Sequence, residues 1–372
     1  MIKKIALAVF LLTLLVASVV SYWFYKQLSQ PLRLESSRLL DIAPGRSFIS
    51  LLNQLEQEGV ISSSLPTRVW LRLTGDAGVI RTGEYQLDPP INLTQLYSKL
   101  QAGDLVTYRV TLVEGSTFEG MRQTLAAAKK LTKTTTDWSE AEIMAALEMP
   151  NQAAEGWFFP DTYTYSKGMQ DLDLMRQANR TMQQLLKEVW ASRASGLPYK
   201  TPYDALIMAS IVERETGAPH EREAIAGVFV RRLQKGMRLQ TDPTVIYGMD
   251  KNYQGKITRR NLREATPWNT YTNYGLPLTP IALPGAAALK ASVNPAQGKA
   301  LYFVAKGDGT HQFSASLEAH NQAVRKYQLQ RREDYRSWPA PPTHEQEATR
   351  EQSIEQSIEQ RSEQSSEQDA SQ

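Results

Sequence analysis

The sequence contains no cysteine among its 372 residues. This absence excludes disulfide bonds, zinc–thiolate sites, iron–sulfur clusters and thiol nucleophiles, although it does not fix a cellular compartment. Histidine is also scarce, with four residues, and none belongs to a His-Glu-x-x-His zinc pair. We interpret His311 and His320 as hydrogen-bonded structural residues. The sequence predicts neither a metal nor a cofactor.

The chain also lacks an excess of charge of one sign and several common catalytic motifs. Its 42 basic and 39 acidic residues leave a net charge of +3, which is too small to indicate a nucleic-acid partner. It has no Walker A loop, no Gly-x-Gly-x-x-Gly loop and no Gly-x-Ser-x-Gly elbow. Its 41% hydrophobic content excludes a wholly disordered chain and a multi-span membrane protein. Carboxylate chemistry is the main route that these absences leave open.

One long apolar run stands at the N-terminus. Lys3 and Lys4 precede the uncharged segment from Ile5 to Phe24. Roughly 20 helical residues span about 30 Å, the thickness of the hydrocarbon core. A cleaved signal peptide is the alternative, but the aromatic residues of segment 22–25 occupy the place where small residues would precede cleavage. We predict an uncleaved anchor with a cytoplasmic N-terminus, because the two lysines favour that side.

We predict an α+β protein of roughly two ordinary domains behind this anchor. The last segment repeats Glu-Gln-Ser and has few apolar residues, a composition typical of disorder. The expected divisions are a cytoplasmic N-terminus (1–4), a transmembrane anchor (5–25), a linker (26–37), a LysM-like module (38–105), a connecting strand and helices (106–154), a catalytic domain (155–332) and a low-complexity polar tail (337–372).

The module over residues 38–105 is predicted from its order of elements. Apolar spacing, glycines and prolines place strands and helices at 40–43, 48–58, 66–73, 83–87 and 92–100. Strand, helix, helix and strand is the order of a LysM-type glycan-binding module. A spacer domain without a ligand is the alternative that the pattern leaves open.

A helix that ends near Thr216 carries the best candidate for a catalytic group. We expect Asp204 to cap its start. At about 100° per residue, Glu215 falls among apolar side chains, whereas Ser210 and Arg214 fall on the polar side.

A carboxyl group in an apolar setting loses hydration, which raises its pKa. A raised pKa is what a general acid needs to protonate a glycosidic oxygen near neutral pH. Glu215 is therefore the predicted acid, and Glu213 is the alternative. The competing interpretation is that both are surface residues at a frayed helix end.

Two further segments offer groups that suit a carbohydrate ligand. A polar cluster precedes Pro243, which is expected to set a turn. Segment 267–271 adds aromatic rings, which stack on pyranose faces, and an amide, which can bind an acetamido group. The predicted substrate-binding residues are Gln240, Thr241, Asp242, Asn269 and Tyr271.

Several short segments follow one another in a distinctive order. The two longest are Ala209–Thr216 and Leu239–Gly248, and the others are Glu155–Tyr163, Asn269–Tyr271, Gly275–Pro277, Pro284–Gly285, Leu289–Lys290, Leu301–Ala305 and His311–Phe313. In this order they resemble the endolytic murein transglycosylases, the YceG-like (MltG) family. The similarity extends from the anchor to about Tyr327.

The resemblance implies a LysM-like module followed by a catalytic domain on the periplasmic side of the inner membrane. Members of the family cleave peptidoglycan glycan strands internally, next to N-acetylmuramic acid, and leave 1,6-anhydro-muramoyl ends. Their catalytic glutamate, the second of a Glu-x-Glu pair, falls on Glu215. The implied role is to end the elongation of nascent strands, with penicillin-binding proteins as partner synthases.

Two alternatives remain open. If the Asp242 carboxyl lies about 5–9 Å from that of Glu215, two carboxylates would suit a lysozyme-like hydrolase. We interpret Asp242 instead as a residue that forms the turn and positions substrate. The second alternative is a non-catalytic, membrane-tethered scaffold that binds glycan during cell-wall synthesis.

Overall fold

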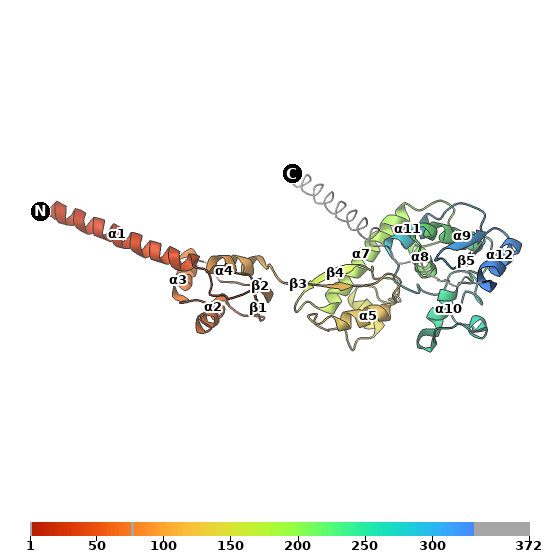
Figure 1. Ribbon diagram of the computed structural model, residues 1–372, viewed down its shortest axis with the longest axis horizontal. Helices are drawn as coiled ribbons and strands as arrows, with labels where there is room; N and C mark the ends of the chain where they lie inside the picture. The colour runs from red at the N-terminus through yellow and green to blue at the C-terminus, as the bar shows by residue number, and fades with distance from the viewer. Residues whose placement is uncertain (1, 76–77, 331–372) are drawn as a thin grey trace. The chain divides into compact units, whose positions relative to one another are not determined.

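The computed structural model describes residues 2–75 and 78–330, and Figure 1 shows their helices and strands in chain order. Within these residues, helices combine with three two-stranded antiparallel sheets. The predicted α+β class is therefore confirmed. The tail predicted over 337–372 lies outside the described residues.

The described residues divide into two compact units. Each unit combines segments that are distant in sequence. The first unit contains the residues up to Leu112, Met121–Ala146 and Asp161–Gln177, and the second contains Val113–Gly120, Leu147–Pro160 and the residues from Ala178 onward.

The first unit begins with α1 (Ile2–Ser29). Between Lys4 and Ser29 this helix has a mean hydropathy of 2.5 over its most apolar window, and no residue of that window is buried. Leu15 and Phe10 are exposed, although both are large and apolar. The helix is long and apolar enough to cross a membrane, as predicted for residues 5–25.

A small module follows, with β1 (Arg38–Ile42), α2 (Phe48–Gln57), α3 (Leu65–Thr74), β2 (Gly83–Leu87) and α4 (Leu93–Ala102). β1 and β2 pair in antiparallel fashion, with Leu40 opposite Tyr85. Phe48 and Tyr97 pack ring to ring in a core that is closed to solvent. The Asn92 side chain caps α4. The order strand, helix, helix, strand is confirmed, and the LysM-like assignment stays a prediction.

The rest of the first unit contains β3 (Thr107–Thr111), most of α5 (Phe118–Ala127), α6 (Glu140–Ala146), β4 (Thr162–Ser166) and the start of α7 (Asp171–Ala191). β3 and β4 form the second sheet, with Val110 opposite Tyr163. The Asp171 carboxylate accepts hydrogen bonds from the backbone and hydroxyl groups of Thr134 and Thr135. These bonds fasten the start of α7 to the loop that precedes α6.

The second unit contains the remainder of α7 and a set of shorter elements. These are α8 (Pro202–Glu215), η1 (Pro219–Glu221), α9 (Arg222–Gln234), α10 (Asp242–Met249), η2 (Asp250–Asn252), η3 (Asn261–Arg263), α11 (Ala286–Val293), β5 (Tyr302–Ala305), β6 (His311–Ser314), α12 (Leu317–Val324) and η4 (Arg325–Leu329). β5 and β6 form the third sheet, with Phe303 opposite Phe313.

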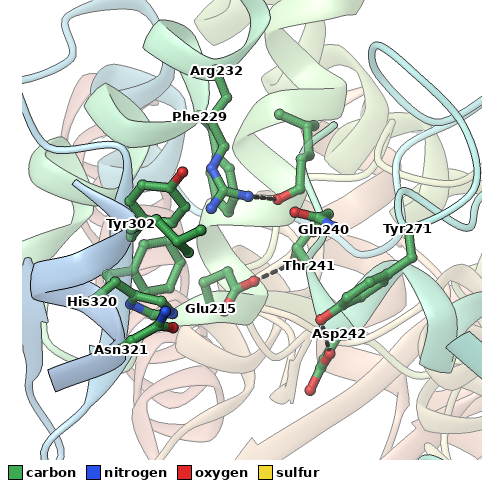
Figure 2. A pocket seen from close by; sticks show the side chains of 13 residues that line it. Glu215, Phe229, Arg232, Gln240, Thr241, Asp242, Tyr271, Tyr302, His320 and Asn321 are labelled. Carbon is green, nitrogen blue, oxygen red and sulfur yellow. Dashed lines mark hydrogen bonds between the residues drawn. The ribbon is translucent and has the colours of Figure 1, made fainter. Parts of the chain in front are cut away.

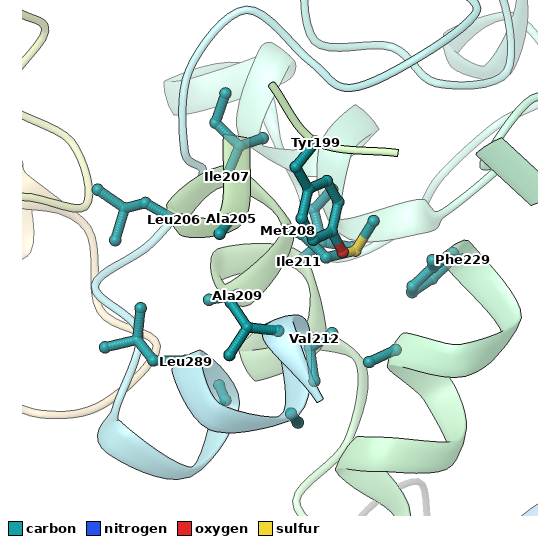
Figure 3. Packing of buried hydrophobic residues seen from close by; sticks show 14 of the residues in the cluster. Tyr199, Ala205, Leu206, Ile207, Met208, Ala209, Ile211, Val212, Phe229 and Leu289 are labelled. Atoms are coloured by element: carbon teal, nitrogen blue, oxygen red, sulfur yellow. The ribbon is translucent and has the colours of Figure 1, made fainter. Parts of the chain in front are cut away.

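α8 is the central helix of this second unit. Every residue from Ala205 to Glu213 is buried, because α9, α10 and α11 all pack against the helix. Figure 3 shows Leu289 of α11 and Phe229 of α9 among the side chains around it. A helix that is apolar nearly all round its circumference is stable only in such an interior position. The end of α8 is therefore held rigidly.

Three local predictions for this unit are wrong. Thr201, and not Asp204, is the N-cap of α8; Asp204 occupies position N3 of the capping box. Ser210 is fully buried: its hydroxyl donates to the Ile207 carbonyl and accepts from the Ile281 amide. Pro243 lies in the first turn of α10 instead of a loop turn, because proline suits the start of a helix.

Candidate active site

A cavity of about 460 Å³ lies in the second unit beside the end of α8. α9, the segment before α10, β5 and α12 complete its wall. Figure 2 shows the arrangement of these side chains around Glu215. The lining residues are Glu215, Phe229, Arg232, Leu239, Gln240, Thr241, Asp242, Tyr271, Tyr302, Phe303, Leu317, His320 and Asn321.

Glu215 is the last residue of α8 and is partly buried in this cavity. Burial is the main cause that raises the pKa of its carboxyl group, and the negative charge of Asp242 also raises it; with the opposing effects included, the pKa is about 7. The Thr241 hydroxyl donates a hydrogen bond to Glu215 Oε1, and this bond and the Arg232 charge act in the opposite direction. Near neutral pH, the protonated and the ionised form of this carboxyl group are therefore present in comparable amounts.

Glu213 has a different environment. Its carboxylate is buried, lies 3.2 Å from Arg222 Nη2 and accepts a hydrogen bond of 2.9 Å from the Gly285 amide. It does not line the cavity around Glu215. A buried carboxylate that is paired with a cation and accepts a backbone hydrogen bond stabilises the fold, so we interpret Glu213 as a structural residue.

The segment before α10 brings the predicted polar cluster to Glu215. Gln240 has a φ of 53°, a left-handed conformation that is uncommon outside glycine. Its amide donates to the Thr270 carbonyl, and the Thr241 amide donates to the Thr270 hydroxyl. These bonds place Gln240, Thr241 and Asp242 in succession along the cavity wall.

Tyr271 and Asp242 form a pair on this wall. The Tyr271 hydroxyl donates a hydrogen bond of 2.6 Å to Asp242 Oδ1. Burial raises the pKa of Tyr271 well above its usual range, and the bond to Asp242 adds to that effect. The phenol is therefore neutral and can donate or accept hydrogen bonds. The structure thus brings together four of the five predicted binding residues.

Asn269, the fifth, does not line the cavity. It is 1% exposed, and its amide nitrogen donates to the carbonyls of Asn261, Leu262 and Glu264. Its side-chain oxygen accepts from the Tyr271 amide. The prediction that Asn269 binds substrate is wrong, because the backbone already occupies its amide. Its observed role is to hold the loop that carries Tyr271.

Two other aromatic residues near Asn269, Trp268 and Tyr274, also lie outside the cavity. Trp268 packs edge-on against Tyr247 and donates its indole hydrogen to the Thr279 hydroxyl. Tyr274 is 68% exposed and lies under the guanidinium of Arg238. Of this loop, Tyr271 alone supplies a ring to the described cavity.

Comparisons with known proteins identify the family of this chain. The model of the YceG-like family matches residues 40–326. The chain belongs to the YceG-like family. It is 28% identical over 338 residues to the endolytic murein transglycosylase of Bacillus subtilis (strain 168), across 82% of this chain and 90% of that protein.

Two further YceG-like proteins are similar to this chain. The endolytic murein transglycosylase of Streptococcus pneumoniae serotype 2 is 25% identical over 328 residues, and the match spans 77% of this chain but 57% of that protein. The crystal structure of a yceG-like protein from Listeria monocytogenes superposes with a TM-score of 0.51 at 28% identity, covering 78% of this chain and 99% of that one.

Four residues of the cavity with polar groups in their side chains are absent from the predicted site of this YceG-like protein: Arg232, Tyr302, His320 and Asn321. The ring of His320 stacks on Tyr302 with centroids 5.2 Å apart, and its Nδ1 has no partner among the described residues. His311 has the predicted structural role, since its ring lies 2.7 Å from Glu221 Oε2. His320 differs because α12 and β5 bring it to Glu215 from a distant part of the sequence.

Proposed function

We propose that this protein is an endolytic peptidoglycan lytic transglycosylase that uses Glu215 as its single acid and base. The observation that carries the proposal is the position of Glu215: it lies in a cavity, and burial raises its pKa to about 7. A carboxyl with such a pKa can donate and accept a proton at the pH where the cell wall is built. The names of the relatives support the same reaction class.

The reaction needs one proton to be given and one to be taken. Protonated Glu215 donates its proton to the glycosidic oxygen between N-acetylmuramic acid and N-acetylglucosamine, and the bond from C1 to that oxygen breaks. The C6 hydroxyl of the same muramoyl residue then attacks C1. The Glu215 carboxylate takes the hydroxyl proton, which closes the 1,6-anhydro ring and restores the acid.

The remaining residues of the cavity fit roles around this step. The Thr241 hydroxyl holds one oxygen of the Glu215 carboxyl group and thereby fixes its orientation. Gln240 and the Asp242–Tyr271 pair offer amide and hydroxyl groups to the acetamido and hydroxyl groups of the sugar. No metal or cofactor is required by this sequence of steps.

We further propose the setting of the enzyme. α1 would anchor it in the inner membrane with residues 1–4 in the cytoplasm, and the catalytic domain over 155–332 would lie in the periplasm. The module over 38–105 would bind glycan in the manner of a LysM domain. Cleavage of strands as they emerge would end their elongation, with penicillin-binding proteins as the partner synthases.

The test is digestion of purified, uncrosslinked peptidoglycan strands with the full-length protein in detergent. Wild type is expected to release internal fragments with anhydro ends, whereas Glu215→Gln releases none. Glu213→Gln is the matched control, because the same change is made two residues away at a group that does not line the cavity. Absence of cleavage by wild type would instead favour the glycan-binding scaffold.

A further inference from the structure

Arg232 enters the cavity from α9 and is held in one orientation. Its Nε donates 2.7 Å to the Leu301 carbonyl, and its Nη1 donates 2.7 Å to the Leu239 carbonyl. The guanidinium also lies 5.1 Å from the ring centroid of Tyr302. Figure 2 shows it extending toward the space above Glu215. The protein therefore fixes this cation instead of leaving it to sample many positions.

The charge of Arg232 has no fixed counter-ion. The residue is 9% exposed, yet it forms no ion pair with an acidic side chain anywhere in residues 2–75 and 78–330. Its Nη2 has no hydrogen-bond partner in this same part of the chain, and it is not among the buried unpaired atoms. The Nη2 group of the guanidinium is thus unpaired and accessible. Burial of an uncompensated cation is costly, which suggests a ligand that supplies the opposite charge.

The acidic groups of the cavity are committed elsewhere. Asp242 accepts the Tyr271 hydroxyl, and Glu215 accepts the Thr241 hydroxyl. Burial lowers the pKa of Arg232, the charge of an ionised Glu215 raises it, and Glu215 must be protonated when the reaction starts. Before the reaction, when Glu215 is protonated, the Arg232 cation is therefore free to attract an anion from the substrate.

The two sugars of peptidoglycan differ in one respect that matters here. N-acetylmuramic acid carries a lactyl ether with a carboxyl group, which is either free or joined to a stem peptide that has carboxylates of its own. N-acetylglucosamine has no such group. A guanidinium N–H group binds a carboxylate through a charge-assisted hydrogen bond, so the free Nη2 group of Arg232 can distinguish the two sugars.

We propose that Arg232 is a specificity residue that binds a carboxylate of the muramoyl unit beside Glu215. This inference rests on the proposed function for the identity of the substrate. The bound anion neutralises the cation, and the sugar is held in a register that presents the bond next to N-acetylmuramic acid. Neutral glycans such as chitin oligomers lack this contact and bind weakly.

The test measures binding instead of cleavage. The full-length Glu215→Gln protein in detergent is titrated with a peptide-free glycan tetrasaccharide whose lactyl carboxylates are free, and with the same tetrasaccharide after conversion of those groups to methylamides. We expect about tenfold to a hundredfold tighter binding of the charged form, as for one charge-assisted contact. Stem-bearing glycan with free or amidated peptide carboxylates shows whether the anion belongs to the lactyl group or to the peptide.

Arg232→Gln, made in the same background, is expected to reduce this preference to less than about threefold. Arg231→Gln is the matched control, because Arg231 is the next residue on α9 and donates in the same way to the carbonyls of Ala300 and Ala296, but it does not line the cavity. It should keep the preference. Arg232→Lys retains the charge and should keep part of it.

Equal binding of charged and neutral ligands by the Glu215→Gln protein would overturn the proposal, and so would a preference that persists in folded Arg232→Gln. If Arg232→Gln fails to fold, the two ligands are compared on Arg232→Lys and the parent. An unchanged charged-to-neutral ratio contradicts a contact made by the fixed guanidinium, and a reduced ratio supports it. Because no step requires cleavage, a protein that binds in this way but does not cut would refute the proposed function alone.

Discussion

Glu213 and Glu215 lie two positions apart on α8, yet one is neutralised by Arg222 and the other lies in a cavity beside Thr241. The helical geometry separates two chemically identical side chains by about 200° around the axis. One side holds the Gly285 amide and the Arg222 cation, and the other holds a space for a ligand. The difference between a structural and a reactive carboxyl group thus arises from packing alone.

We predict that Glu215→Gln lowers the rate of glycan cleavage by about a hundredfold to ten-thousandfold, the usual range for loss of a general acid. Glu213→Gln should instead lower the free energy of unfolding by about 3 kcal/mol, because it removes the nearer anion of Arg222 and leaves only Glu114, at 3.9 Å. Cleavage rates per folded molecule and urea unfolding of both variants check this. A dead but stable Glu213→Gln protein would contradict the assignment.

The hydrogen bond from Thr241 should affect the pH profile of cleavage. This bond stabilises the ionised form of Glu215 and so lowers its pKa, against the larger effect of burial. Thr241→Val is therefore expected to raise the pKa above about 7 and to move the alkaline limb of kcat/KM upward by about one pH unit. Thr241→Ser retains the hydroxyl and is the control. An unchanged limb in Thr241→Val would show that the bond does not act on the catalytic group.

The effect of Asp242 on the pKa of Glu215 is opposite to that of Thr241. Its negative charge raises the pKa of Glu215, so Asp242→Asn should move the alkaline limb to lower pH while cleavage persists. A hydrolase that depends on two carboxylates would instead lose nearly all activity in Asp242→Asn. The pH dependence of kcat/KM for this variant distinguishes the two mechanisms. Asn and Asp have the same shape, so the bond from Tyr271 can be kept.

The position of Glu215 should also reduce the stability of the protein. The folded-state pKa of about 7 lies above the ordinary glutamate pKa of 4.5, which applies to the unfolded chain. As far as Glu215 is concerned, the free energy of unfolding is therefore at its full value below pH 4.5 and falls as the pH rises through about 7. Glu215→Gln should be more stable than wild type by roughly 3 kcal/mol at pH 8 and about equal to it at pH 4, by the same linkage. Thermal unfolding at both pH values measures this, and a stability difference independent of pH would refute it.

Helical periodicity selected Glu215 because this residue follows a run of apolar residues, and the structure places its side chain in a cavity. The same reasoning failed for Ser210, since the helix is enclosed on all sides and its polar side is buried as well. Periodicity describes a helix with one solvent-exposed face. α8 has none over Ala205–Glu213.

The other half of the cavity could not be inferred from local patterns. Tyr302 and His320 reach Glu215 through the pairing of β5 with β6 and the packing of α12, contacts between residues that are distant in sequence. Asn269 shows the opposite error: its residue type suits a sugar site, but the loop backbone uses its amide. Residue type indicates what a side chain can bind, and tertiary contacts determine what it does bind.

The most direct test of the central claim is cleavage of glycan strands in water enriched in oxygen-18, followed by mass measurement of the new ends. If Glu215 alone transfers the proton from the C6 hydroxyl, water does not enter the product. The account predicts 1,6-anhydro ends that carry no label. New reducing ends that contain one oxygen-18 atom would contradict it and would show that the protein hydrolyses its substrate.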